Sequence, residues 1–432
     1  MENRGPMRIL MLAPAVWLLA APLPAQDNAG LLNRMKAMED RIKALEAEVQ
    51  TLKGQQAVAA AQPAVPAQPP PAAVPQQAPA PVVLGGAGGA AAKALNPDIS
   101  AIGDFLGAIG NGANRGAPAL EMHESELGFQ EVIDPYARAD FFLSFGEEGV
   151  ELEEGYLTFT ALPAALQLKV GKMRAAFGRV NGLHNHVLPW TDRPLVTQDL
   201  VAGEDGIDDA GLSLSRILPA PKGIFLEGTA QLFRGDTEGL FRAARRSDVS
   251  TVEHLRMYGD LSESTNLDLG LSYARGHSPY ADAANQLYGI DATLRWKPLR
   301  RAIYHSFTGR GEFIWARTAA SPQTGNQLLT PFGFYVSGDY QFARRWFVGG
   351  RFDRSQRGAC MPTNPPTTSA CDLPASRLLQ DTGGSLILTY WPSEFSQIRG
   401  QLRRTRYGEG LTANELLFQF QFSMGAHGAH PF

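Results

Sequence analysis

The sequence predicts an all-β transmembrane antiparallel barrel of about 16 strands, preceded by a short α-helical coiled coil. Three observations support the barrel. Polar and apolar residues alternate over many short segments after residue 96, which gives each strand one charged and one apolar face. The connections alternate between tight turns and long polar loops, as they do in transmembrane barrels. Aromatic residues gather beside the tight turns, at the level where membrane headgroups favour them.

The composition excludes several other classes of protein. The chain has 432 residues with 39 Lys and Arg against 43 Asp and Glu, so its balance gives no reason to expect a nucleic-acid partner. Its two cysteines supply neither a disulfide framework nor a cysteine-rich metal cluster. Beyond the N-terminus no run of about 18 uninterrupted apolar residues occurs, so any membrane span must be built from strands.

Residues 1–25 have the pattern of a cleaved secretory signal peptide. Arg8 supplies a positive start, Ile9 to Ala21 form a short apolar core, and small residues lead to a cleavage point after Ala25. This core is too short to span a bilayer. We therefore expect an exported mature chain that begins after residue 25.

Residues 26–53 predict a periplasmic coiled coil. Apolar residues recur at alternating spacings of four and three, at Leu31, Met35, Met38, Ile42, Leu45, Val49 and Leu52. In a parallel arrangement the flanking Arg34, Arg41 and Glu48 face residues of opposite charge, which favours self-association over a lone amphipathic helix. The linker 54–95 is rich in Pro, Ala and Gly and predicts an extended spacer without a core.

Residues 96–432 predict the barrel itself. In one predicted strand Arg399 and Gln401 alternate with Ile398 and Leu402. Tight turns are expected at 161–164, 218–222, 262–264, 297–301, 343–344 and 392–394. Long loops are expected at 111–118, 173–206, 235–249, 276–285, 319–329 and 355–377. A soluble sandwich shares the alternation of side chains, but it has no reason to keep this alternation of loop lengths.

The longest predicted loop, 173–206, is the candidate constriction. Its Arg174, Arg179 and Arg193 oppose Asp192, Asp199, Glu204 and Asp205. Opposite charges across a narrow passage would create a transverse field that acts on ions and dipolar solutes. The alternative is an outer loop that merely caps the barrel.

Charged residues on the predicted inner face form a second candidate set. The basic ones are Arg138, Arg295, Arg351, Arg399 and Arg403, and the acidic ones are Asp140, Asp268, Asp291, Asp339 and Asp353. Guanidinium groups suit carboxylate and phosphate solutes. Because the aspartates offset them, we expect a weak preference for anions at most.

Histidine and cysteine pairs offer few further sites. His184 and His186 form one pair and His427 and His430 another, and imidazole is a common zinc ligand. No cysteine lies near either pair, so we predict structural or surface histidines and expect neither a metal nor another cofactor. Cys360 and Cys371 fall in one predicted outer loop and predict a local disulfide after export.

Catalytic motifs are missing from the sequence. No nucleophile–base or paired-carboxylate pattern exceeds chance. Glu151, Glu153 and Glu154 are predicted as polar wall residues. We therefore expect that the chain is not an enzyme.

Several segments carry a family resemblance. The layout resembles the trimeric outer-membrane porins of the phosphate-selective and dicarboxylate-channel groups, some of which have an N-terminal coiled coil. The segments 96–100, 161–163, 168–172, 183–186 and 426–430 resemble a porin-like family often labelled a zinc-regulated, TonB-dependent receptor. Such receptors resemble one another in a 22-strand barrel with an N-terminal plug, whereas about 335 residues here suit about 16 strands and no plug. The terminal Phe432 resembles the signal that barrel-assembly machinery recognises.

The resemblance implies a homotrimeric porin for passive diffusion of small solutes, with anions as the candidate class. Its expected partners are outer-membrane lipids, two further copies of the chain joined through the coiled coil, peptidoglycan and the barrel-assembly machinery. One alternative is a structural tether between outer membrane and peptidoglycan with an occluded barrel. The other is an uptake receptor for a metal such as zinc or for another substrate.

Overall fold

The computed structural model describes Lys36, which is helical, and residues 97–432 apart from 112–118, 147–148, 280–281, 320–327, 359–377 and 426–432. Several predictions therefore lie outside the described residues and stay predictions. These are the signal peptide 1–25, nearly all of the coiled coil 26–53, the linker 54–95, the Cys360–Cys371 disulfide, and His427 and His430.

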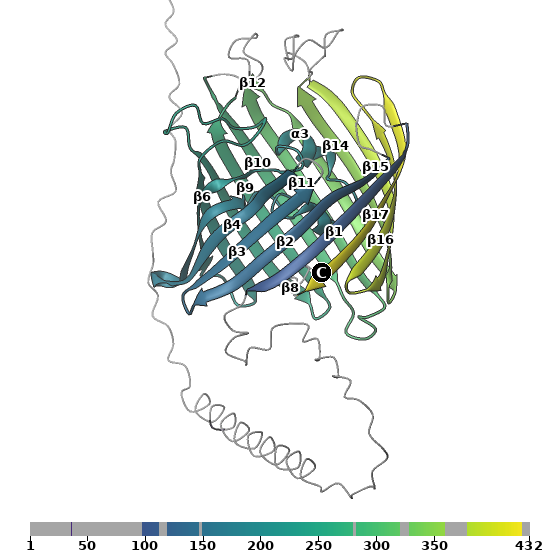
Figure 1. The fold of residues 1–432 in the computed structure, drawn as a ribbon, viewed down its shortest axis with the longest axis horizontal. Helices are drawn as coiled ribbons and strands as arrows, with labels where there is room; N and C mark the ends of the chain where they lie inside the picture. The colour runs from purple at the N-terminus through teal and green to yellow at the C-terminus, as the bar shows by residue number, and fades with distance from the viewer. Residues whose placement is uncertain are drawn as a thin grey trace, which may run out of the picture. The chain divides into compact units, whose positions relative to one another are not determined.

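Sixteen long strands and one two-residue strand, β12, form a single antiparallel sheet (Figure 1). The predicted fold class is confirmed for the barrel. In chain order the strands are β1 (Asp98–Gly110), β2 (Leu120–Asp134), β3 (Ala137–Gly146), β4 (Gly149–Leu162), β5 (Leu166–Arg174), β6 (Asp208–Leu218), β7 (Ile224–Phe233), β8 (Ser250–Ser262), β9 (Thr265–His277), β10 (Ala284–Trp296), β11 (Ser306–Ala319), β12 (Leu328–Leu329), β13 (Phe332–Ala343), β14 (Trp346–Gly358), β15 (Leu378–Ser393), β16 (Ser396–Arg406) and β17 (Thr412–Gly425). Short helices are η1 (Pro163–Ala165), η2 (Asn185–Val187) and α3 (Leu195–Leu200).

The sheet closes because β1 pairs with β17 on one side and with β2 on the other. These three strands cross the front of Figure 1. Closure leaves none of the sixteen long strands with an unpaired edge, which is the condition for a sheet in lipid. On the seam, Gly107 lies opposite Phe418, whose ring occupies the space that a side chain at Gly107 would need.

The two faces of the wall differ as the alternation predicts. On β16, Ile398 is 46% exposed on the outside whereas its neighbour Arg399 is 4% exposed on the inside. On β17, Phe420 is 42% exposed and Gln419 is 1% exposed. The outer face is thus apolar and the inner face polar, as in transmembrane barrels. Among the described residues, no helix is long and apolar enough to cross a membrane.

The connections follow the predicted parity with two exceptions. Two-residue turns join β8 to β9, β13 to β14 and β15 to β16. The connection 297–305 on the tight-turn side is longer than predicted, and the connection 147–148 on the long-loop side is shorter. Strict alternation of loop lengths was therefore wrong in detail. Beside two of the tight turns, Trp346 stacks on Tyr390 with ring centroids 4.4 Å apart.

Candidate functional site: the loop inside the barrel

The connection between β5 and β6, residues 175–207, lies inside the barrel. It begins two residues later and ends one residue later than the predicted loop 173–206, because β5 ends at Arg174 and β6 begins at Asp208. Its backbone N–H groups donate to inward-facing side chains on five strands. The pairs are Ala176 with Gln231 on β7 (2.6 Å), Gly178 with Ser272 on β9 (2.9 Å), Val180 with Glu312 on β11 (2.6 Å), Thr191 with Gln401 on β16 (3.0 Å) and Leu195 with Asp353 on β14 (3.2 Å).

These contacts distinguish between the two alternatives for the loop, which were a constriction inside the barrel and an outer loop that caps it. The acceptor strands occupy widely separated positions around the ring. The helix α3 at the far end of the loop contacts β11, β13, β14 and β15, and Figure 1 shows it enclosed by the wall strands. A loop that touches the inner wall on so many sides crosses the lumen and does not merely cap the barrel.

An apolar core attaches the loop to one side of the wall. Trp190 is 1% exposed and its ring meets Tyr335 of β13 edge to face, with centroids 5.0 Å apart. Phe177 is equally buried and belongs to the same cluster as Phe233 of β7 and Leu287 of β10. Burying such side chains stabilises the loop by about 1.5–3 kcal/mol each. The lumen at this level is therefore packed rather than uniformly filled with water.

Asp192 is the polar anchor on another side of the ring. Its carboxylate accepts hydrogen bonds from Arg403 (2.6 Å), Arg351 (3.0 Å) and Gln401 (2.5 Å) of the wall. Burial raises the pKa of Asp192, but the two guanidinium groups outweigh it and hold that pKa well below its usual range. Asp192 is thus ionised and pairs with wall arginines, not with the arginines of its own loop.

The other charged loop residues also differ from the predicted opposing arrangement. Arg174 is buried and donates to Glu153 of β4 (3.2 Å). Arg193 is buried and donates to the carbonyls of Val180 and Leu183 within the loop, and burial lowers its pKa to about 10. Asp199 lies half-buried in α3, and Glu204 and Asp205 are exposed near the end of the loop. Most of these charges hold the loop in place.

Arg179 is the exception among the loop arginines. Its backbone N–H donates to Glu312, but its half-buried guanidinium has no hydrogen-bond or ion-pair partner among the described residues. It lies near Asp268 and Arg295 on the wall. Arg179 therefore differs from Arg174 and Arg193, whose guanidinium groups hold the loop in place.

The predicted wall arginines all face inward, but only some are accessible. Arg351, Arg399 and Arg403 are buried in contacts with other side chains. Arg138 keeps a side chain that is 45% exposed, beside Asp140 at 2.7 Å. Sequence reasoning missed Arg256, which pairs with Asp268 (2.7 Å), and Arg310, which pairs with Asp339 (2.5 Å). Arg256 lies in β8 and Arg310 in β11.

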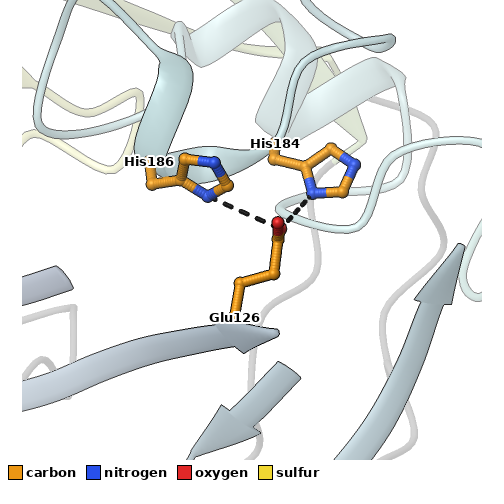
Figure 2. A group of neighbouring side chains, drawn as sticks. All are labelled: Glu126, His184 and His186. Carbon is orange, nitrogen blue, oxygen red and sulfur yellow. Dashed lines mark hydrogen bonds and ion pairs between the residues drawn. The ribbon is translucent and has the colours of Figure 1, made fainter. Parts of the chain in front are cut away.

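The histidine pair of the loop faces a group of buried carboxylates rather than the surface. His184 Nδ1 lies 2.5 Å from Glu126 of β2 (Figure 2). Its Nε2 lies 2.9 Å from Glu154 of β4. Burial lowers the pKa of His184, but its hydrogen bonds to Glu126, Glu153 and Glu154 outweigh it and raise that pKa well above the usual value. Glu126 could not be predicted as part of this group, because 58 residues separate it from His184 along the chain.

Known proteins resemble this chain in fold. No family model matches it. An uncharacterized protein of Aquifex aeolicus (strain VF5) is 29% identical over 401 residues, covering 79% of this chain and 81% of the relative. The high-pH structure of Pseudomonas putida OprB is 10% identical with a TM-score of 0.52, covering 76% of this chain and 94% of that one. An anion-selective porin from Comamonas acidovorans is 11% identical with a TM-score of 0.51, covering 76% and 99%.

The two solved structures share the barrel architecture with this chain at very low identity. The likeness therefore concerns the fold, which is a closed antiparallel barrel.

Proposed function

We propose that the chain is an outer-membrane porin through which small solutes diffuse passively, with the loop 175–207 setting the width and charge of the passage. The observation that carries this proposal is the loop itself, which is fixed by hydrogen bonds to inward-facing side chains of five strands of a closed barrel. The apolar outer face and charged inner face agree with a water-facing lumen in a membrane.

A weak preference for anions belongs to the same proposal. The partly accessible Arg256, Arg295 and Arg310 line the wall near Arg179. Aspartates pair with the three wall arginines and reduce their net attraction for anions. The similar porin from Comamonas acidovorans is described as anion-selective, which supports the same sign here. The wall has fewer strands than the 22 of TonB-dependent receptors, which favours a porin over such a receptor.

The N-terminal segments complete the proposed arrangement. The signal peptide 1–25 directs export, the coiled coil 26–53 joins three copies in the periplasm, and the linker 54–95 separates it from the barrel. The barrel-assembly machinery inserts the barrel among outer-membrane lipids, and the periplasmic part contacts peptidoglycan. Crosslinking of purified protein before and after removal of residues 26–53 tests whether this segment holds the trimer together.

Planar-bilayer recording of the purified protein in a salt gradient tests the channel. Stepwise conductance is expected, in groups of three for a trimer, and the sign of the reversal potential gives the charge preference. A folded protein that never conducts would overturn the proposal. It would favour the alternative of an occluded barrel that acts as a tether, for which the apolar packing of Trp190 and Phe177 inside the lumen is the supporting observation.

A further inference from the structure

Two strand irregularities lie where acidic side chains enter the lumen. The register between β3 and β4 shifts so that Glu153 is an extra residue on β4. Such a bulge interrupts the alternation of faces, and both Glu153 and Glu154 reach His184 in the lumen, at 3.1 and 2.9 Å. A second shift, between β1 and β2, lies directly before Glu124. Bulges are over-represented beside functional sites because they redirect side chains.

The imidazoles of the loop point at these carboxylates with the geometry of metal ligands. One oxygen of Glu126 lies 2.5 Å from His184 Nδ1 and 3.6 Å from His186 Nδ1 (Figure 2). These three atoms lie within 4.8 Å of one another. Ligand atoms around a tetrahedral zinc ion are about 3.3 Å apart, given bonds of about 2.0–2.1 Å. A small separation of His184 from Glu126 would therefore admit an ion.

The second ring nitrogen of His184 contacts a carboxylate, as the second ring nitrogen of many metal-bound histidines does. Its Nε2 lies 2.9 Å from the carboxylate of Glu154. A carboxylate that accepts this N–H fixes the tautomer and leaves Nδ1 as the ligand atom.

The cluster contains more acidic than basic side chains. Glu124 is 5% exposed, and its carboxylate accepts no N–H or hydroxyl hydrogen bond from the described residues. One oxygen of Glu124 lies within 4.8 Å of oxygens of Glu126 and Glu153. The basic groups that contact this group are the Arg174 guanidinium, 3.2 Å from Glu153, and the imidazoles of His184 and His186. Buried like charges are costly unless a further cation balances them.

We propose that Glu126, His184 and His186, completed by a carboxylate of Glu124 or Glu153, bind one divalent transition-metal ion. Mixed imidazole and carboxylate ligands select an ion such as zinc over magnesium or calcium, which prefer oxygen alone. The ion joins the loop to β2 and β4, where Tyr156 of β4 also packs against the apolar cluster. The site therefore adds coordination bonds between the wall and the part of the loop that carries His184 and His186.

Metal titration of the full-length protein in detergent tests this proposal. The protein used in every titration carries His427→Ala and His430→Ala, so that the terminal histidines bind no metal ion. After treatment with a chelator, we expect one zinc ion per chain by calorimetry and a visible absorption spectrum of tetrahedral type with cobalt. Magnesium and calcium should bind at least tenfold more weakly.

Two variants and a matched control locate the ion. Glu124→Gln and His186→Ala should each weaken zinc binding at least tenfold, in line with the loss of a ligand or its charge. His254→Ala removes another inward-facing imidazole, which contacts Ser272 on a distant wall, and should leave binding unchanged. Heat-dependent migration on gels verifies that each variant is folded.

Three results would overturn the inference. They are the absence of stoichiometric zinc binding in the folded protein, binding that survives both variants, and equal affinity for magnesium. Because binding is measured in detergent, it does not depend on whether the barrel conducts, so failure here leaves the porin proposal intact.

Discussion

The carboxylate of Asp192 and the guanidinium of Arg403 lie 2.6 Å apart, although 211 residues separate them along the chain. Arg351 binds the same carboxylate, and each arginine also pairs with a wall carboxylate, Asp353 or Glu415. The middle of the loop is therefore fixed to β14 and β16. Arg351 and Arg403 are both buried in these ion pairs.

Replacing Asp192 by Asn should loosen this anchor. The change leaves two buried guanidinium groups with less negative charge, and removing one partner of a buried pair costs about 3–5 kcal/mol. The remaining contacts to Asp353 and Glu415 place the loss near the lower value. We expect a lower midpoint of thermal unfolding and a larger, noisier single-channel conductance.

Asp282→Asn is the control for this change, because the Asp282 side chain is fully exposed in the connection between β9 and β10. Its conductance should match that of the unaltered protein. Identical conductance of the Asp192→Asn variant would show that this anchor does not hold the loop.

Replacing Arg179 by Gln should shift selectivity towards cations. The guanidinium of Arg179 is half-buried and lacks an ion-pair partner among the described residues, so it is available to an anion. A single charge at contact distance in water is worth about 1 kcal/mol, which corresponds to a change of up to about fivefold in permeability ratio. The reversal potential in a salt gradient measures this shift.

Arg354→Gln removes the same charge from the outer face of β14, where Arg354 is exposed and donates to Gln380. Its reversal potential should stay unchanged. Equal shifts in both variants would mean that overall charge, and not the position of Arg179, determines selectivity.

Replacing Gly107 by Val should weaken the seam of the barrel. An ideal Cβ at Gly107 would lie 1.9 Å from the Phe418 ring, which must then move out of its contact with β1. Overpacking of this kind costs about 1–3 kcal/mol. We expect a lower temperature for the heat-dependent change in gel migration.

Gly400→Val is the matched control on β16, where a Cβ would meet no atom within 4 Å. A β-branched residue suits an open strand position, so this variant should keep the original transition temperature. A seam variant as stable as the control would show that the Phe418 ring moves without cost.

The fold was predictable because period-two alternation is a local property of the chain. Ile398 beside Arg399 already indicates which face of β16 meets lipid. The lumen loop was found by its length, but its contacts were not, because Asp192 and Arg403 are distant in sequence. The bulge that turns both Glu153 and Glu154 inward depends on the register with β3, which alternation within one strand does not reveal.

The hydrogen bonds of the loop have a consequence for the order of assembly. Val180 binds Glu312, which comes 132 residues later, and Thr191 binds Gln401, which comes 210 residues later. Contacts of such long sequence separation form only after the intervening chain has been arranged. The strands that carry these acceptors must therefore be in place before these two contacts can form, so the loop docks fully only after most of the wall has formed.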